Sequence, residues 1–170
     1  MKTKLEFYHT IVAIVGKHNV AIGGSMSLLA HKDPSVSPDY VPGDIDLCIG
    51  SEYHLMLIDQ HLISLGYVRT LDIPQPFGFT VRRQYKLGIE KHDFFINPDL
   101  GSLISDIDDI TYINTSVVWC ARGFYAGLGS DKAWNQLVNA GVIGPHKRFK
   151  MSFRQKIKKY ILDFKYLISL

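Results

Sequence analysis

The sequence is poor in cysteine and has no long apolar run. These two absences exclude disulfide scaffolds and proteins that span a membrane. Cys48 and Cys120 are the only cysteines among 170 residues, which excludes a disulfide framework and favours a reducing, cytoplasmic setting. No apolar stretch reaches the roughly 18 residues that cross a bilayer. The 11–15 run is too short for a signal-peptide core. We therefore expect no secretory leader and no membrane partner.

Repeats and low-complexity stretches are also absent, and the composition is that of a globular protein. Hydrophobic residues make up 46% of the chain and aromatic residues 12%. This excludes a disordered or collagen-like chain and supplies enough apolar material for one compact domain with its own core.

Charge is small in total but uneven along the chain. The net charge is +3, yet residues 145–170 hold eight Lys or Arg and one acid, whereas the first 144 residues are net acidic. A basic tail favours a polyanionic partner, and RNA contact through residues 147–159, for instance with a tRNA acceptor end, is one interpretation. The other is a solvated helix face whose apolar stripe packs on the body.

Hydrophobic periodicity predicts an α+β (mixed α/β) fold: a mixed sheet of four to five strands flanked by helices, followed by a helical C-terminal section. We expect residues 1–98 to form the core of the protein and residues 99–170 a helical section packed on it. The predicted strands are 19–22, 44–49, 67–71, 80–87 and 89–96. The predicted helices are 3–17, 25–30, 51–65, 100–108, 115–126, 131–140 and 152–168.

A glycine turn joins the first predicted strand to the following helix. Gly23 and Gly24 let the backbone approach a ligand closely, and the first turn of a helix offers free amide donors to an anion. Ser25 adds a hydroxyl that can donate to a phosphate oxygen. Such a turn also occurs for purely structural reasons.

Two carboxylates occupy the start of the second predicted strand. Alternation along a strand places Asp44 and Asp46 on one face and Ile45 on the other. Adjacent anions repel each other, and a divalent cation such as Mg²⁺, which takes one or two carboxylates plus substrate phosphates, is the natural compensation. The alternative is a surface strand with two solvated acids.

Together the two features resemble the nucleotidyltransferase superfamily that includes DNA polymerase β. The closest likeness is to its small bacterial members: minimal nucleotidyltransferases, aminoglycoside nucleotidyltransferases and AbiEii-type toxins. The matching residues are Ile22-Gly23-Gly24-Ser25 and Gly43-Asp44-Ile45-Asp46-Leu47. Asp44 follows Ser25 by 19 positions, a wider gap than many members have, so residues 34–42 should form an inserted loop at the rim of the site.

The resemblance implies a third carboxylate on a nearby strand. Asp93 supplies it, with Asp72 and Asp99 as alternatives. In this family such a residue completes the metal site and can take the proton from the attacking hydroxyl. The resemblance further implies two Mg²⁺ ions held by Asp44, Asp46 and Asp93, and an NTP as donor substrate.

Four other residues have more than one interpretation. The resemblance places Lys132, near the start of a downstream helix, at the nucleotide phosphates, although an exposed helix lysine is the plain alternative. Arg82 and Arg83 lie on opposite faces of a strand, so at most one can point into a cleft and bind phosphate or acceptor. The alternative, which we favour, is a surface contact to a neighbouring strand. Cys48 alternates toward the same face of its strand as Asp44 and Asp46, and we interpret it as a small packing residue, not as a nucleophile.

The sequence thus predicts a Mg²⁺-dependent nucleotidyltransferase that moves an NMP from an NTP to an acceptor hydroxyl and releases pyrophosphate. The acceptor is open among a small molecule, tRNA and protein. A second copy of the chain is a further open partner. Two alternatives remain: a non-catalytic nucleotide- or RNA-binding domain or partner subunit of the same family, and an unrelated α+β domain with a fortuitous match.

Overall fold

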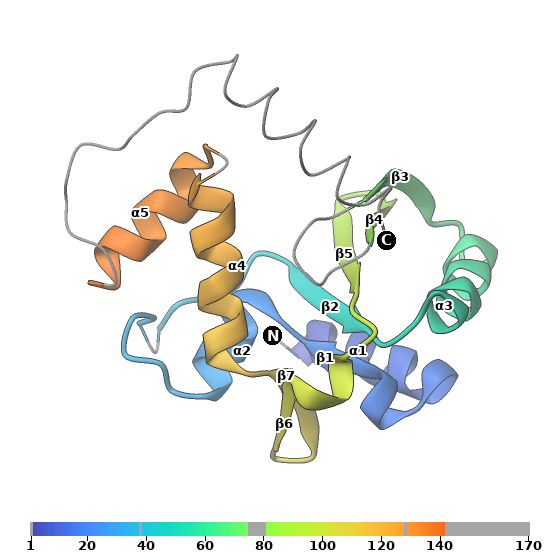
Figure 1. Ribbon diagram of the computed structural model, residues 1–170. Helices are drawn as coiled ribbons and strands as arrows, with labels where there is room; N and C mark the ends of the chain where they lie inside the picture. Colours follow the sequence, from blue (N-terminus) through green and yellow to red (C-terminus); the bar gives the residue numbers. More distant parts are fainter. Residues whose placement is uncertain (1, 38, 75–80, 128, 142–170) are drawn as a thin grey trace, which may run out of the picture. The chain divides into compact units, whose positions relative to one another are not determined.

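The computed structural model describes residues 2–37, 39–74, 81–127 and 129–141 (Figure 1). The chain divides into two compact units, residues 1–118 and 119–170. The helix predicted over 152–168 and the basic segment 147–159 lie outside the described residues. No helix within the described ranges combines the length and the apolar character that crossing a membrane requires.

A mixed sheet forms the centre of the first unit. Its spatial order is β3-β4-β5-β2-β1-β7-β6. The pairs β2·β5 and β1·β7 are parallel, and the other neighbours are antiparallel. The strands are β1 (Val20–Ile22), β2 (Ile45–Ile49), β3 (Val68–Pro74), β4 (Val81–Leu87), β5 (Glu90–Ile96), β6 (Ile104–Ile107) and β7 (Ile110–Ile113).

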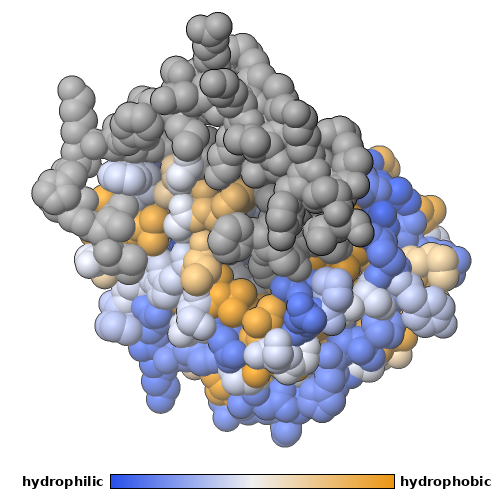
Figure 2. All heavy atoms as spheres, in the orientation of Figure 1, coloured by the Kyte–Doolittle hydropathy of each residue, from blue (hydrophilic) through white to orange (hydrophobic). Residues whose placement is uncertain are grey.

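The α+β class is confirmed, but the predicted count of four to five strands is wrong, because the described residues form a seven-stranded sheet. The two additional strands fall where a helix was predicted over 100–108. Leu100–Ser102 is a short 3₁₀ turn, and the chain then enters the β6–β7 hairpin. Asp108 and Asp109 adopt φ values of 48° and 63°, the left-handed pair that a two-residue hairpin turn requires. Figure 2 shows hydrophilic surface at the lower end of the view, where Figure 1 places this hairpin.

The described residues also form five α-helices, and two of them begin at a side-chain cap. The Ser51 hydroxyl accepts a hydrogen bond from the His54 amide at 3.2 Å, and the Ser130 hydroxyl accepts one from the Ala133 amide at 3.2 Å, so both serines are N-caps. The helices are α1 (Lys2–Val15), α2 (Gly24–Ala30), α3 (Glu52–Ser64), α4 (Thr115–Gly127) and α5 (Asp131–Asn139). They confirm the helices predicted over 3–17, 25–30, 51–65, 115–126 and 131–140.

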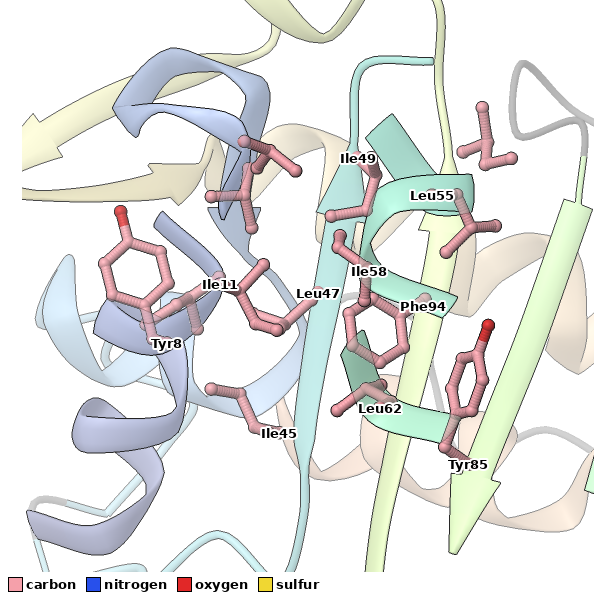
Figure 3. Packing of buried hydrophobic residues seen from close by; sticks show 14 of the residues in the cluster. Tyr8, Ile11, Ile45, Leu47, Ile49, Leu55, Ile58, Leu62, Tyr85 and Phe94 are labelled. Atoms are coloured by element: carbon pink, nitrogen blue, oxygen red, sulfur yellow. The ribbon is translucent and has the colours of Figure 1, made fainter. Parts of the chain in front are cut away.

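The hydrophobic core of the first unit lies between one face of the sheet and the helices α1 and α3. Alternation on β2 turns Ile45, Leu47 and Ile49 toward this layer, where each is fully buried. Figure 3 shows these side chains packed with those of the two helices and with Phe94 and Tyr85 of the neighbouring strands. The side chains of alternate positions therefore belong to the opposite face of the sheet.

The second unit has a small core of its own. Ala126, Ala133 and Leu137 are buried there, with Trp119 and Trp134 packed against them. Lys132 belongs to this unit, in the first turn of α5.

Candidate functional site

Charged and polar residues line the sheet face opposite the core. Asp46 on β2 is the register partner of Asp93 on β5, and Asp93 is in turn the partner of Gln84 on β4. Residues that are directly paired across neighbouring strands project from the same face. The three side chains therefore form one polar row across the strands β2, β5 and β4.

Asp93 is the most deeply buried member of this row, with only 3% of its surface exposed. Gln84 Nε2 donates to Asp93 Oδ1 at 2.8 Å, and Arg82 Nη2 lies 3.1 Å from Oδ2. The Gln84 amide is itself fixed, because its oxygen accepts a hydrogen bond from the Thr70 hydroxyl at 3.0 Å. A buried carboxylate is costly unless it is paired and hydrogen-bonded, and here both oxygens have partners.

Asp44 lies just before β2 and is joined to Asp93 through a shared cation. Lys91 Nζ is 3.9 Å from Asp44 Oδ2 and 3.5 Å from Asp93 Oδ2. The Asp44 side chain is 43% exposed, whereas that of Asp93 is 4% exposed. The acidic residues thus run from a buried end at Asp93 to a solvent-accessible end at Asp44.

The glycine turn lies directly against Asp46. The Gly23 amide donates to the Asp46 carbonyl oxygen at 2.8 Å. Gly24 has φ +58°, and a Cβ atom at this position would overlap Asp46 Oδ2. Position 24 therefore requires glycine both for its backbone conformation and for the close approach to the carboxylate. Ser25 follows in the first turn of α2. The glycine turn and the Asp46 carboxylate are therefore neighbours.

Cys48 completes the same face of β2 as a buried side chain. Its Sγ lies 3.5 Å from the position a Cβ of Gly23 would take. Burial raises the pKa of the Cys48 thiol well above its ordinary value, and the negative charge of Asp46 raises it further. A neutral, buried thiol is a poor nucleophile, which agrees with its interpretation as a packing residue.

The donor set on this face suits Mg²⁺ in kind. Among the described residues, no three His, Cys, Asp or Glu side chains are grouped closely enough to hold a metal ion. Mg²⁺ nevertheless takes only one or two protein carboxylates when a triphosphate supplies further oxygens. Asp46 and Asp93, which are paired on adjacent strands, are the residues that could supply these carboxylates.

The alternative third carboxylates lie elsewhere. Asp72 Oδ2 pairs with Arg69 at 3.1 Å and with Arg83 at 3.0 Å. Asp72 is the register partner of Arg83, which projects from the opposite side of β4 to Arg82. Asp99 precedes the 3₁₀ turn, and its backbone amide donates a hydrogen bond to Asn97 Oδ1 at 2.9 Å. Of the three candidates, Asp93 is the register partner of Asp46.

Two residues of the polar face were missed in the sequence. Gln84 and Lys91 both contact Asp93, and neither was singled out. The available signal was alternation, since Lys91 precedes Asp93 by two positions on the same strand and therefore shares its face. Both arginines make the cross-strand contacts that were expected of them: Arg82 contacts Asp93 of β5, and Arg83 contacts Asp72 of β3.

Comparisons with known proteins add little to this geometry. No protein-family model matches the chain, and no significant match is found among curated proteins. Among solved structures, the chain is similar to JHP933 from Helicobacter pylori at 13% sequence identity and a TM-score of 0.43. That similarity covers 98% of this chain and 76% of the other. A likeness at this level carries no argument about the function of this chain.

Proposed function

We propose that this protein is a Mg²⁺-dependent nucleotidyltransferase that transfers an NMP from an NTP to an acceptor hydroxyl. The observation that supports it most is the pairing of Asp46 with Asp93 on adjacent parallel strands, next to a glycine turn that lies against Asp46. A turn that can approach phosphates and a row of carboxylates that can take a divalent cation are what this reaction requires.

The acidic residues are proposed to bind the metal and to act on the acceptor hydroxyl. Asp44, Asp46 and Asp93 would hold Mg²⁺, which neutralises the triphosphate and stabilises the charge of an in-line displacement. Asp93 would take the proton of the acceptor hydroxyl, or orient that hydroxyl while the proton goes to water, as the new bond to the α-phosphorus forms. The bond from that phosphorus to pyrophosphate breaks, and the leaving group carries the electron pair away.

Phosphate contacts come from neutral groups. Ser25 and the backbone at Gly23 and Gly24 would hold the β- and γ-phosphates. Because positioning and electrostatics supply most of the rate enhancement in phosphoryl transfer, this division needs no covalent intermediate on the protein.

A second function has one observation in its favour. Arg82 and Lys91 already neutralise Asp93, so a non-catalytic domain that binds a nucleotide or RNA could keep its carboxylates without a metal. Binding of an NTP that needs no Mg²⁺, without transfer of label, would favour this function.

The direct test is transfer of label. Purified protein is incubated with each α-³²P-labelled NTP, Mg²⁺ and cell extract, and the products are separated into RNA, protein and small molecules. Label in one fraction, dependent on Mg²⁺ and on Asp46, is expected and names the acceptor class. Absence of labelling together with absence of Mg²⁺-dependent NTP binding would contradict the proposal.

A further inference from the structure

One ammonium group is shared by two carboxylates of the polar face. Lys91 Nζ lies 3.5 Å from Asp93 Oδ2 and 3.9 Å from Asp44 Oδ2. The Lys91 side chain is 39% exposed, so it reaches the buried Asp93 carboxylate from the solvent side. A cation thus stands between the oxygens that the proposed function assigns to Mg²⁺.

The two oxygens of Asp93 have different roles in this arrangement. Oδ1 accepts the hydrogen bond from Gln84, while Oδ2 faces both Arg82 and Lys91. The Gln84 amide, anchored by Thr70, keeps the carboxylate from rotating. Oδ2 is therefore the oxygen that is presented to cations.

Arg82 and Lys91 differ in how easily each side chain can move away from Asp93 Oδ2. The Arg82 guanidinium also lies over the Phe95 ring, 5.8 Å from its centroid, which holds it from a second side. Lys91 ends a flexible four-carbon stem and is more exposed than Arg82. Of the two cations, Lys91 is the one that can swing out toward solvent.

We propose that Lys91 is a built-in counter-cation that competes with the divalent metal for Asp44 and Asp93. This inference rests on the proposed function. Without metal, its ammonium offsets the repulsion between the carboxylates. When the metal enters, the ammonium leaves and turns to the triphosphate, whose negative charge replaces that of the carboxylates. Free metal is thereby held weakly, and metal and NTP bind cooperatively.

Removing the Lys91 charge should have opposite effects on the affinity for metal alone and on the cooperativity between metal and NTP. Loss of the Lys91 charge removes a competitor, so free metal binds more tightly. It also removes the group that links the metal to the triphosphate, so the gain in metal affinity on adding NTP shrinks. Coupling between two ligands is reciprocal, so the metal's effect on NTP affinity shrinks by the same factor.

The test compares Lys91→Met with Lys86→Met. Lys86 is the register partner of Lys91, projects from the same face and is exposed, so its removal matches the change in net charge. Mn²⁺ binding is measured by the loss of the free-ion EPR signal, with and without a non-hydrolysable NTP analogue. We expect Lys91→Met to bind free Mn²⁺ at least tenfold more tightly and Lys86→Met to stay within threefold of the wild type.

Thermal melting gives a second readout that does not depend on activity. In EDTA, Lys91→Met should melt at a lower temperature than the wild type, because the carboxylates repel each other, and Mn²⁺ should restore more stability to it than to the wild type. Lys91→Gln, which keeps a polar group, serves if the methionine variant does not fold.

Failure of this inference can be told from failure of the proposed function. Equal shifts for the Lys91 and Lys86 variants, while Asp46→Asn abolishes Mn²⁺ binding, would overturn the role of Lys91 and leave the metal site in place. No Mn²⁺ binding by any variant, with or without the NTP analogue, would overturn both.

Discussion

The two faces of the central sheet come from the same strands but carry different side chains, apolar on one face and polar on the other. On β2, Ile45 and Leu47 enter the apolar layer under α1 and α3, while Asp46 and Cys48 lie on the other face. On β5, Phe94 is fully buried in the core, while its neighbour Asp93 is buried among polar partners.

The difference lies in what each face needs from its residues. The apolar face needs volume and hydrophobicity, which several residue types supply at small cost. The polar face needs a carboxylate at a given atom position, with a donor and a cation matched to it, as at Asp93. Substitutions on the first face should therefore act mainly through stability, and those on the second mainly through function.

The largest effect is expected from Asp46→Asn. The change keeps the shape but removes the charge next to the glycine turn, so transfer should fall about a thousandfold or more, the order seen when an electrostatic group of a site is removed. Pyrophosphate release and the melting temperature are measured together. Asp109→Asn, in the fully exposed hairpin turn, is the control and should retain activity. Near-normal activity in Asp46→Asn at an unchanged melting temperature would remove the mechanism.

Phe94→Ala tests the apolar face. Its ring is fully buried and packs edge-on against Tyr85 at a centroid distance of 5.4 Å. Truncation should cost about 3–5 kcal/mol of the free energy of unfolding, measured by urea denaturation. Residual transfer per folded molecule should stay near the wild type. A loss below about 1 kcal/mol would mean that this layer is not the core of the unit.

Gly24→Ala and Gly23→Ala form a matched pair at the edge of the polar face. A methyl group at position 24 meets Asp46 Oδ2 at a positive φ, whereas at position 23 its nearest neighbour is Cys48 Sγ at 3.5 Å, an ordinary contact. Gly24→Ala should therefore cost about 1–2 kcal/mol of stability and displace the Asp46 carboxylate, lowering activity more than tenfold. Gly23→Ala should be much milder. Equal effects of the two changes would contradict the close approach of the turn to Asp46.

The smallest effect concerns pH and His92, which faces the core. Its ring stacks on Phe7 at 3.7 Å, and both ring nitrogens are buried without a hydrogen-bond partner among the described residues. Burial lowers the pKa of His92 below its ordinary value of 6.5, against the opposing pull of Glu90, Asp93 and Asp44.

The sign of the resulting pH dependence follows from proton binding. Between the lowered pKa and 6.5, the unfolded chain binds more protons at His92 than the folded one, so stability is lost as pH falls through this window. His92→Phe should flatten the fall in unfolding free energy between pH 7 and pH 5 relative to the wild type. An unchanged slope would show that His92 does not carry the effect.

Much of the first unit could be predicted from the sequence because its signals are local. The alternation over 44–49 separates Ile45 from Asp46, and the Ser51 cap marks the start of α3. The β6–β7 hairpin was missed, although Asp108-Asp109 between two isoleucine-bounded strands is a turn signal in retrospect. Each of these strands has only four residues, too few for alternation to outweigh a helical interpretation.

The candidate site was predictable in part. A local pattern revealed Asp44 and Asp46, because Asp44 lies just before β2 and Asp46 lies within it. The same holds for the glycine turn, which lies between β1 and α2. The pairing of Asp46 with Asp93 joins distant strands through a parallel register, which no local pattern specifies. The partners Gln84 and Lys91 follow only once that register is known.

Paramagnetic NMR tests most directly whether the polar face of β2 and β5 binds a metal–nucleotide complex. Stoichiometric Mn²⁺ with a non-hydrolysable NTP analogue is added to ¹⁵N-labelled protein. The amide signals of Asp46 and Asp93 should broaden first, while those of Asp108 and Asp109 in the hairpin turn persist. Broadening that spares Asp46 and Asp93 but removes other signals would contradict the assignment of this face to nucleotidyl transfer.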